Sequence, residues 1–158
     1  MMAGHRNAPT LQRQMTYRLN VLSKINDMLS QELYLQGTGL SLPQARCLAA
    51  VGSVTGELTV NEVAFEANLD KAQVSRTAQD LVERGLMSKR PSPVDGRCVQ
   101  LALTPQGRAC WQQVMALIEQ RNIELLHCLS AQEQDQLADM LERMLGRARQ
   151  QLASSRQG

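Results

Sequence analysis

Amide and guanidinium side chains recur on one side of a short predicted helix near the middle of the chain. When residues 71–84 are placed at intervals of about 100°, four small or polar residues gather opposite an apolar stripe: Ala72, Gln73, Arg76 and Gln79. Glutamine can form paired hydrogen bonds with adenine, and arginine can do so with guanine or contact a phosphate. The pattern therefore indicates a helix that reads bases in the major groove of double-stranded DNA.

The residues around this face also fit contact with DNA. Small Ala72 would let the helix approach closely, and Lys71 and Ser75 flank the face as candidate phosphate contacts. Further along the same side lie Asp80 and Glu83, which phosphates would repel. We therefore expect only the first two turns of this helix to enter a groove.

A second candidate contact follows the helix, on a predicted β-hairpin. Two short extended segments are joined by a proline-stiffened loop: 86–90 and 98–103, with the loop at 91–97. Arg97 lies on this loop beside Asp95, whose carboxylate is predicted to hold the guanidinium in position. An arginine on a protruding turn suits the narrow, electronegative minor groove. The base of the first strand adds two basic residues, Lys89 and Arg90.

Capping signals divide the middle of the chain into short helices. Two of them pair a cap with an amide or carboxylate three residues later: Thr59 with Glu62, and Asp70 with Gln73. The other is a serine cap at Ser41, with Pro43 in the first turn of its helix. They predict helices at 41–51, 60–67 and 70–84. Two short helices closed by a hairpin are the arrangement of a winged helix-turn-helix.

Longer amphipathic helices are predicted on both sides. Leucine, isoleucine and methionine recur at helical spacing from Pro9 to about Leu35, and we expect Gly37 and Gly39 to end that helix. Thr104 and Pro105 open another long helix, and a serine cap at position 130 begins the last one. Their apolar faces exceed what one small domain can cover, which predicts a homodimer.

The predicted fold class is therefore mainly α with a small β-hairpin wing, a winged helix-turn-helix flanked by long dimerisation helices. The expected organisation is an N-terminal dimerisation helix at 1–36, a DNA-binding domain at 41–103 and C-terminal dimerisation helices at 104–158.

Several motifs together resemble the multiple-antibiotic-resistance regulator (MarR) family over nearly the whole chain. They are Val74-Ser75-Arg76 in the recognition segment, Asp95-Gly96-Arg97 in the wing, and Leu103-Thr104-Pro105-Gln106-Gly107 at the start of the fifth helix. The resemblance implies a homodimer whose two recognition helices read the half-sites of a pseudo-palindrome, with repression as the expected outcome.

The resemblance also implies roles for individual residues. Arg97 would be the minor-groove arginine oriented by Asp95, while Gln73 and Arg76 would lie in the major groove. Gly96 replaces the second basic residue usual in the family's wing, which leaves more of the contact to Arg97. Two further residues resemble the family's additional backbone contacts, Ser41 and Gln44.

Family members commonly release DNA when a small aromatic or phenolic acid binds between the dimerisation helices and the winged domain. An arginine beside an aromatic side chain would suit such a ligand. The candidates are Tyr17, Arg18, Arg46, Trp111 and Met115. The alternative is that Trp111 and Met115 are core residues and that the arginines are solvated.

Composition and motifs bear on the other function classes. The 158 residues carry a formal net charge of +2, too small to indicate a nucleic-acid partner by itself. No nucleophile elbow, phosphate loop or zinc-protease motif occurs, so we expect no enzyme activity and no cofactor. The opening residues lack the apolar stretch of a secretory signal and no apolar run suits a membrane span, so a cytoplasmic protein without a membrane partner is expected.

Cysteine and histidine patterns leave one regulatory alternative open. The four cysteines include no C-x-x-C pair, which argues against a disulfide framework or a structural zinc site. Cys47 or Cys98 would serve as a redox switch only if its thiol were exposed and its pKa lowered. His5 and His127 are far apart in the sequence, so no metal site is expected. A winged helix used only for protein contacts is the other alternative.

Overall fold

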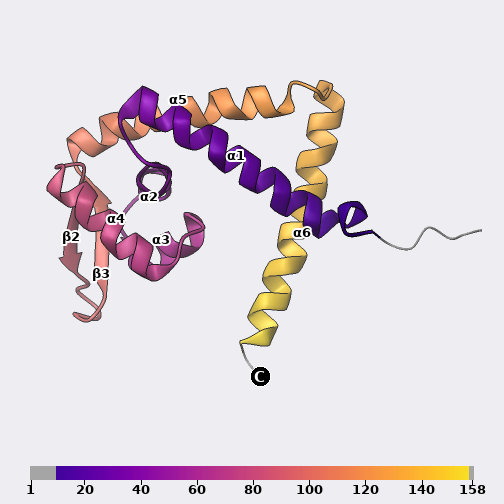
Figure 1. Cartoon of the computed structure of the whole chain (residues 1–158). Helices are drawn as coiled ribbons and strands as arrows, with labels where there is room; N and C mark the ends of the chain where they lie inside the picture. The colour runs from indigo at the N-terminus through magenta and orange to yellow at the C-terminus, as the bar shows by residue number, and fades with distance from the viewer. Residues whose placement is uncertain (1–9, 157–158) are drawn as a thin grey trace, which may run out of the picture. The chain divides into compact units, whose positions relative to one another are not determined.

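The computed structural model describes residues 10–156, which divide into two compact units, up to Ile118 and from Glu119 onward. The chain is mainly helical, with one small antiparallel sheet (Figure 1). This confirms the predicted fold class. Pro9 and His5 lie outside the described residues.

The first unit contains most of the elements. Its helices are a 3₁₀ turn at Leu11–Arg13, α1 at Met15–Thr38, α2 at Leu42–Gly52, α3 at Val60–Glu66 and α4 at Lys71–Glu83. Its strands are β1 at Leu58–Thr59, β2 at Met87–Pro91 and β3 at Val99–Leu103. Helix α5, Pro105–Leu126, crosses the boundary between the units, and α6, Ala131–Ser155, belongs to the second.

The first long helix differs from its prediction at both ends. It begins at Met15, after the separate 3₁₀ turn, and it runs through Gly37 to Thr38. Gly39 is the residue that ends it, because this glycine adopts a left-handed conformation with φ of 69°. Gly37 does not act as a stop signal, since a single glycine inside a well-packed helix is tolerated.

The predicted capping boxes are all present. Thr59 accepts a hydrogen bond from the backbone of Glu62, whose carboxylate accepts one in return from the Thr59 backbone at 2.7 Å. The same reciprocal pattern starts α4 at Asp70, and the serine cap at Ser41 forms one too, with Gln44. Each box fixes the residue at which its helix begins, and replacing such a cap by alanine typically costs about 1 kcal/mol.

The sheet has the strand order β1-β3-β2 and is antiparallel throughout. The hairpin was predicted, but β1 was not, because two residues provide no alternation that sequence analysis can detect. Leu58 pairs with Leu101 and Thr59 with Gln100. Since α3 starts directly after Thr59, this short strand attaches the first helix of the helix-turn-helix to the wing.

The apolar face of α4 is buried in the core of the first unit. Val74 and Leu81 are completely inaccessible and Ala78 nearly so. Burying a valine or leucine side chain contributes about 2 kcal/mol, so this face holds the helix in a fixed orientation. The opposite face, predicted to read DNA, is thereby directed outward.

Apolar side chains remain exposed on the long helices of each unit. On α1 the exposed fractions are 48% for Leu22, 51% for Ile25 and 66% for Met28. Helix α6 has no buried residue, although it carries a row of exposed apolar side chains: Met140, Leu141, Met144, Leu145 and Leu152. Among residues 10–156, no helix is both long and apolar enough to cross a membrane.

Candidate nucleic-acid interface

The start of α4 presents short and basic side chains to solvent. Lys71, Ala72, Ser75 and Arg76 are exposed, and Gln73 is partly buried. Alongside them runs a surface groove of about 600 Å³ lined mainly by α4 and by Pro43 of α2. The lining from α4 comprises Gln73, Ser75, Arg76, Thr77, Gln79 and Asp80.

Gln73 and Arg76 differ in how free their side chains are. The amide oxygen of Gln73 accepts a hydrogen bond from the Asp70 backbone at 3.4 Å, as part of the capping box. Pairing with adenine needs both ends of the amide, so Gln73 would have to leave this contact. The Arg76 guanidinium makes no hydrogen bond or ion pair within residues 10–156. Of the two, Arg76 is therefore the more available to DNA.

Gln79 connects α4 to the wing. Its amide nitrogen donates to the Glu83 carboxylate at 2.8 Å, and its amide oxygen accepts from the Lys89 ammonium of β2. Arg90, the next basic residue of β2, forms an ion pair with Glu57 at 2.7 Å. The side chains at the base of the wing are thus engaged within the protein, where they hold the hairpin against α4 and the segment before β1.

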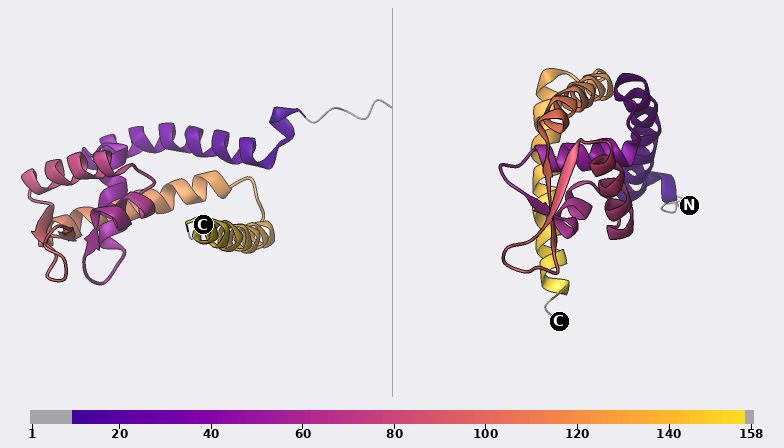
Figure 2. Two further views of the ribbon diagram at one scale, coloured as in Figure 1. Left: turned by 90° about the horizontal axis from the view of Figure 1, so that it is seen from below. Right: turned by 90° about the vertical axis from the view of Figure 1, so that its left-hand side faces the viewer.

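The loop at the end of the β2–β3 hairpin extends away from the short helices (Figure 2). Arg97 lies on this loop and is exposed. The prediction that Asp95 holds its guanidinium differs from what the structure contains. One Asp95 oxygen accepts from the backbone N–H of Arg97 at 3.0 Å, and the other accepts from the Cys98 thiol at 3.6 Å. Asp95 therefore orders the turn and leaves the Arg97 side chain in solvent.

Ser41 and Gln44 lie at the start of α2, where both serve the capping box. The Gln44 amide oxygen accepts from the Ser41 backbone at 3.0 Å and from the Arg84 guanidinium at 3.2 Å. Arg84 also donates to the carbonyl of Gly39 at 3.4 Å. Sequence analysis did not single out Arg84, which ties the end of α4 to the junction of α1 and α2. No sequence pattern predicts a contact between residues so distant along the chain.

Two of the five predicted ligand residues meet at a cavity of about 590 Å³ in the first unit. Arg46 of α2 and Met115 of α5 both line it. Trp111 instead packs against Gly52, and the Arg108 guanidinium lies 5.2 Å from its ring centre. Tyr17 and Arg18 lie in the first turn of α1 and are not among the lining residues, and Arg18 donates to the Gln12 carbonyl at 3.1 Å.

The cysteines differ in their environment. Cys47 is buried, and burial raises the pKa of its thiol to about 12. Cys98 and Cys110 are partly buried, and Cys128 is exposed. Cys47 is therefore protonated at neutral pH and is a poor nucleophile. Among residues 10–156, no three histidine, cysteine or acidic side chains are grouped so that they could hold a metal ion.

The α4 face beside a protruding hairpin defines a winged helix-turn-helix protein, and comparison with known proteins agrees with that class. A family model described as MarR family matches residues 38–97, from the end of α1 to the tip of the wing. The winged-helix region of this chain is similar to that of the MarR family of transcriptional regulators. This is a family of DNA-binding regulators rather than enzymes.

Two curated relatives are bacterial regulators. The chain is 33% identical over 88 residues to the uncharacterized HTH-type transcriptional regulator YdgJ of Bacillus subtilis. The aligned region covers 56% of this chain and only 54% of YdgJ. It is 27% identical over 110 residues to the HTH-type transcriptional repressor Rv2887 of Mycobacterium tuberculosis, covering 70% of this chain and 78% of the repressor.

Solved structures extend the likeness to most of the chain. A MarR/EmrR family transcriptional regulator from Acinetobacter has a TM-score of 0.77 and 25% identity, covering 90% of this chain and 99% of its own. BpsR of Bordetella bronchiseptica, whose DNA binding is regulated by 6-hydroxynicotinic acid, has a TM-score of 0.74 and 22% identity, covering 87% of this chain and 97% of its own. The second likeness concerns the fold alone.

Proposed function

We propose that this protein is a homodimeric repressor that binds a pseudo-palindromic operator and releases it when a small effector binds. The observation that carries the proposal is the exposure of two basic regions, the start of α4 and Arg97 on the hairpin loop. Arg76 would contact a guanine or a phosphate in the major groove, while Arg97 enters the adjacent minor groove. Asp80 and Glu83 limit the insertion to the first turns of α4.

Dimerisation is supported by the apolar surfaces of the long helices. Helix α6 exposes Met144 and Leu145 by 47% and 48%, and α1 exposes Leu22 and Ile25 by similar fractions. A row of exposed apolar side chains along a helix is typical of an interface. We propose that 1–36 and 104–158 form the dimer and that 41–103 binds DNA, so that two copies of α4 face two half-sites.

The proposed effector site is the cavity that Arg46 and Met115 line. Its volume of about 590 Å³ suits a small organic molecule. The effector class predicted from the sequence is a small aromatic or phenolic acid, bound through an arginine. Of the two arginines predicted to bind the effector, only Arg46 lines the cavity. The proposed effector is therefore a small molecule that fits this volume, with no chemical class assigned from Arg46 alone.

Two alternatives are less well supported. A redox switch at Cys47 or Cys98 would need an exposed, reactive thiolate. Burial keeps the Cys47 thiol protonated, and the Cys98 thiol is partly buried and donates to Asp95 at 3.6 Å. A winged helix that makes only protein contacts would not need free arginines at both the helix and the wing. Substituting Arg97 separates this second alternative from DNA binding.

The test is selection of binding sites from a random DNA pool at near-physiological salt. The proposal predicts an enriched inverted repeat with half-sites about one helical turn apart. It also predicts that the wild-type protein binds this site far more tightly than a scrambled duplex of the same composition. Failure to enrich any sequence, with folded protein, would support the protein-contact alternative.

The dimer is tested separately by sedimentation equilibrium at micromolar concentration. The wild-type protein should sediment as a dimer, and Met144→Glu should weaken it because a carboxylate enters an apolar interface. The matched control is Glu142→Gln, a change elsewhere on α6, which should leave the dimer intact. A monomeric wild-type protein would contradict the proposed assembly.

A further inference from the structure

We propose that the effector cavity selects an organic cation with an apolar body, such as an aromatic amine, rather than an aromatic acid. The inference about regulation rests on the proposed DNA-binding function, whereas ligand binding itself can be measured without DNA. The proposed ligand is a cation, whereas the sequence predicted an aromatic acid. The difference arises because the side chains around the cavity carry more negative than positive charge.

The body of the ligand would lie against apolar side chains. They come from α2, α5 and the segment before α3, namely Ala49, Ala50, Val54, Leu58, Met115 and Ile118. An apolar wall with a few charged groups is the usual composition of a small-molecule site. The apolar lining therefore favours a hydrocarbon group, and the charged residues determine which charge that group must carry.

Two carboxylates of α3 line the same cavity, Glu62 and Glu66. Hydrogen bonds from the backbone and hydroxyl of Thr59 lower the pKa of Glu62 below its usual value, so this carboxylate is ionised at neutral pH. Glu66 is the last residue of α3 and is exposed. Both groups attract a cation and repel a carboxylate.

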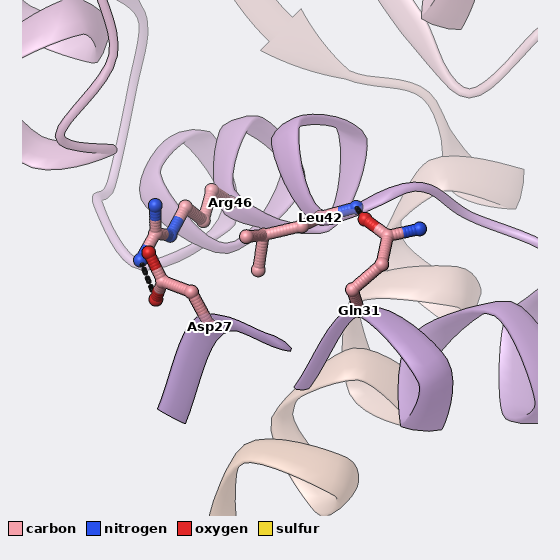
Figure 3. A network of polar contacts seen from close by, with 4 residues as sticks. All are labelled: Asp27, Gln31, Leu42 and Arg46. Atoms are coloured by element: carbon pink, nitrogen blue, oxygen red, sulfur yellow. Dashed lines mark hydrogen bonds and ion pairs between the residues drawn. The ribbon is translucent and has the colours of Figure 1, made fainter. Parts of the chain in front are cut away.

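The single arginine of the lining does not offset these charges. The Arg46 guanidinium lies 2.5 Å from the Asp27 carboxylate of α1 and forms an ion pair with it (Figure 3). Close by, the Gln31 side chain accepts a hydrogen bond from the Leu42 backbone at 2.7 Å, which also fastens α1 to α2. Since the charge of Arg46 is matched by Asp27, the two glutamates leave the surroundings of the cavity net negative.

The position of the cavity also connects it to the recognition helix. Ala67 and Asn68 line it and form the turn between α3 and α4. Asn68 has a left-handed φ of 51°, and the following Leu69 donates to the Ala64 carbonyl at 3.0 Å. A ligand bound to Glu66 would therefore contact the turn that precedes Asp70, the N-cap of α4. Binding at this turn can alter how α4 is presented, which is what release of DNA requires.

The experiment compares three molecules of nearly equal shape, 1-naphthylmethylamine, 1-naphthylmethanol and 1-naphthoate, as ligands of the full-length protein by calorimetry and NMR. The ammonium compound should bind most tightly and the carboxylate least. Glu66→Gln should weaken the amine by up to about fivefold, the upper range for one exposed charge pair. Glu142→Gln on α6, outside the cavity, should leave its affinity unchanged, and added salt should weaken the amine but not the alcohol.

Tighter binding of the naphthoate, or equal binding of the amine to wild type and Glu66→Gln, would overturn the inference. Absence of binding by all three molecules would overturn it as well. The regulatory part is tested by adding the amine to the complex with the selected operator, where the apparent DNA affinity should fall. If the amine binds but DNA affinity is unchanged, the coupling through the Asn68 turn is wrong. If no operator can be selected, the proposed function fails while the ligand measurement still stands.

Discussion

Replacing Gly107 by alanine should destabilise the protein, although the same change usually strengthens a helix. Gly107 lies in the first turn of α5, against the backbone of Leu86. A Cβ atom added there would lie 1.8 Å from the Leu86 carbonyl oxygen and 2.8 Å from its carbon. Real Cβ contacts essentially never fall below 3.0 Å, so α5 and the start of the wing must separate by more than 1 Å.

The magnitude follows from two opposing effects. Alanine gains about 1 kcal/mol over glycine inside a helix. Overpacking a rigid contact costs about 3 kcal/mol or more, and here the obstacle is backbone, which cannot rotate away. The net expectation is a loss of about 2 to 3 kcal/mol in the free energy of unfolding, or roughly 5 to 10 °C in Tm. The Leu86 carbonyl also accepts from the Thr104 backbone at 3.2 Å, so the shift should reach the hairpin.

The assay is urea unfolding followed by circular dichroism, with operator binding measured at a temperature where the variant is folded. The matched control is Gly146→Ala in α6, where no described atom lies within 4 Å of the added Cβ. It should stabilise by up to about 1 kcal/mol. If Gly107→Ala were as stable as the wild type, the packing described for the wing and α5 would be wrong.

Three further predictions concern the wing, the helix caps and the thiols. Arg97→Ala should lower operator affinity and reduce the slope of log affinity against log salt by about one, measured by fluorescence anisotropy at several salt concentrations; an unchanged slope would argue against a minor-groove contact. Because the pKa of Glu62 is lowered in the folded protein, its stabilising effect is present above pH 4.5 and is lost as pH falls through the lowered pKa. Glu62→Gln should therefore flatten the acid side of the stability profile, and parallel profiles for both proteins would refute this assignment. In a thiol titration of the native protein at pH 8, Cys128 should react rapidly and Cys47 only after unfolding; rapid reaction of Cys47 would contradict its burial.

The parts of the fold that depend on local chemistry could be predicted from the sequence. Thr59 with Glu62, and Asp70 with Gln73, use side chains three residues apart, so residue type and spacing are enough to predict their capping boxes. The outward face of α4 followed from helical periodicity in the same way. The end of α1 was predicted less well, because glycine can either stop a helix or pack within it, and only tertiary contacts decide between the two.

The site was predictable in its residue types but not in its connections. Gln79 and Lys89 were both expected to contact DNA, but the sequence gives no sign that they bind each other. The contact of Asp95 with the Arg97 backbone is an Asx turn, a local preference of aspartate that competes with the predicted contact to the Arg97 guanidinium. The ion pair of Arg46 with Asp27 joins α1 to α2, and it changes the ligand class that an arginine alone would suggest. The partners of these side chains depend on contacts between segments that are distant in the sequence.

Repeating the site selection with Gln73→Ala/Arg76→Ala shows whether the exposed start of α4 reads bases in an operator. This variant should still fold, because both side chains lie outside the buried face of α4 and the Asp70 cap itself is kept; only the 3.4 Å hydrogen bond from the Asp70 backbone to Gln73 is lost. The variant should bind more weakly, and its selected inverted repeat should lose the preference for at least one base pair in each half-site. Recovery of the wild-type repeat, with unchanged affinity and unchanged preference at every position, would contradict base reading by this helix.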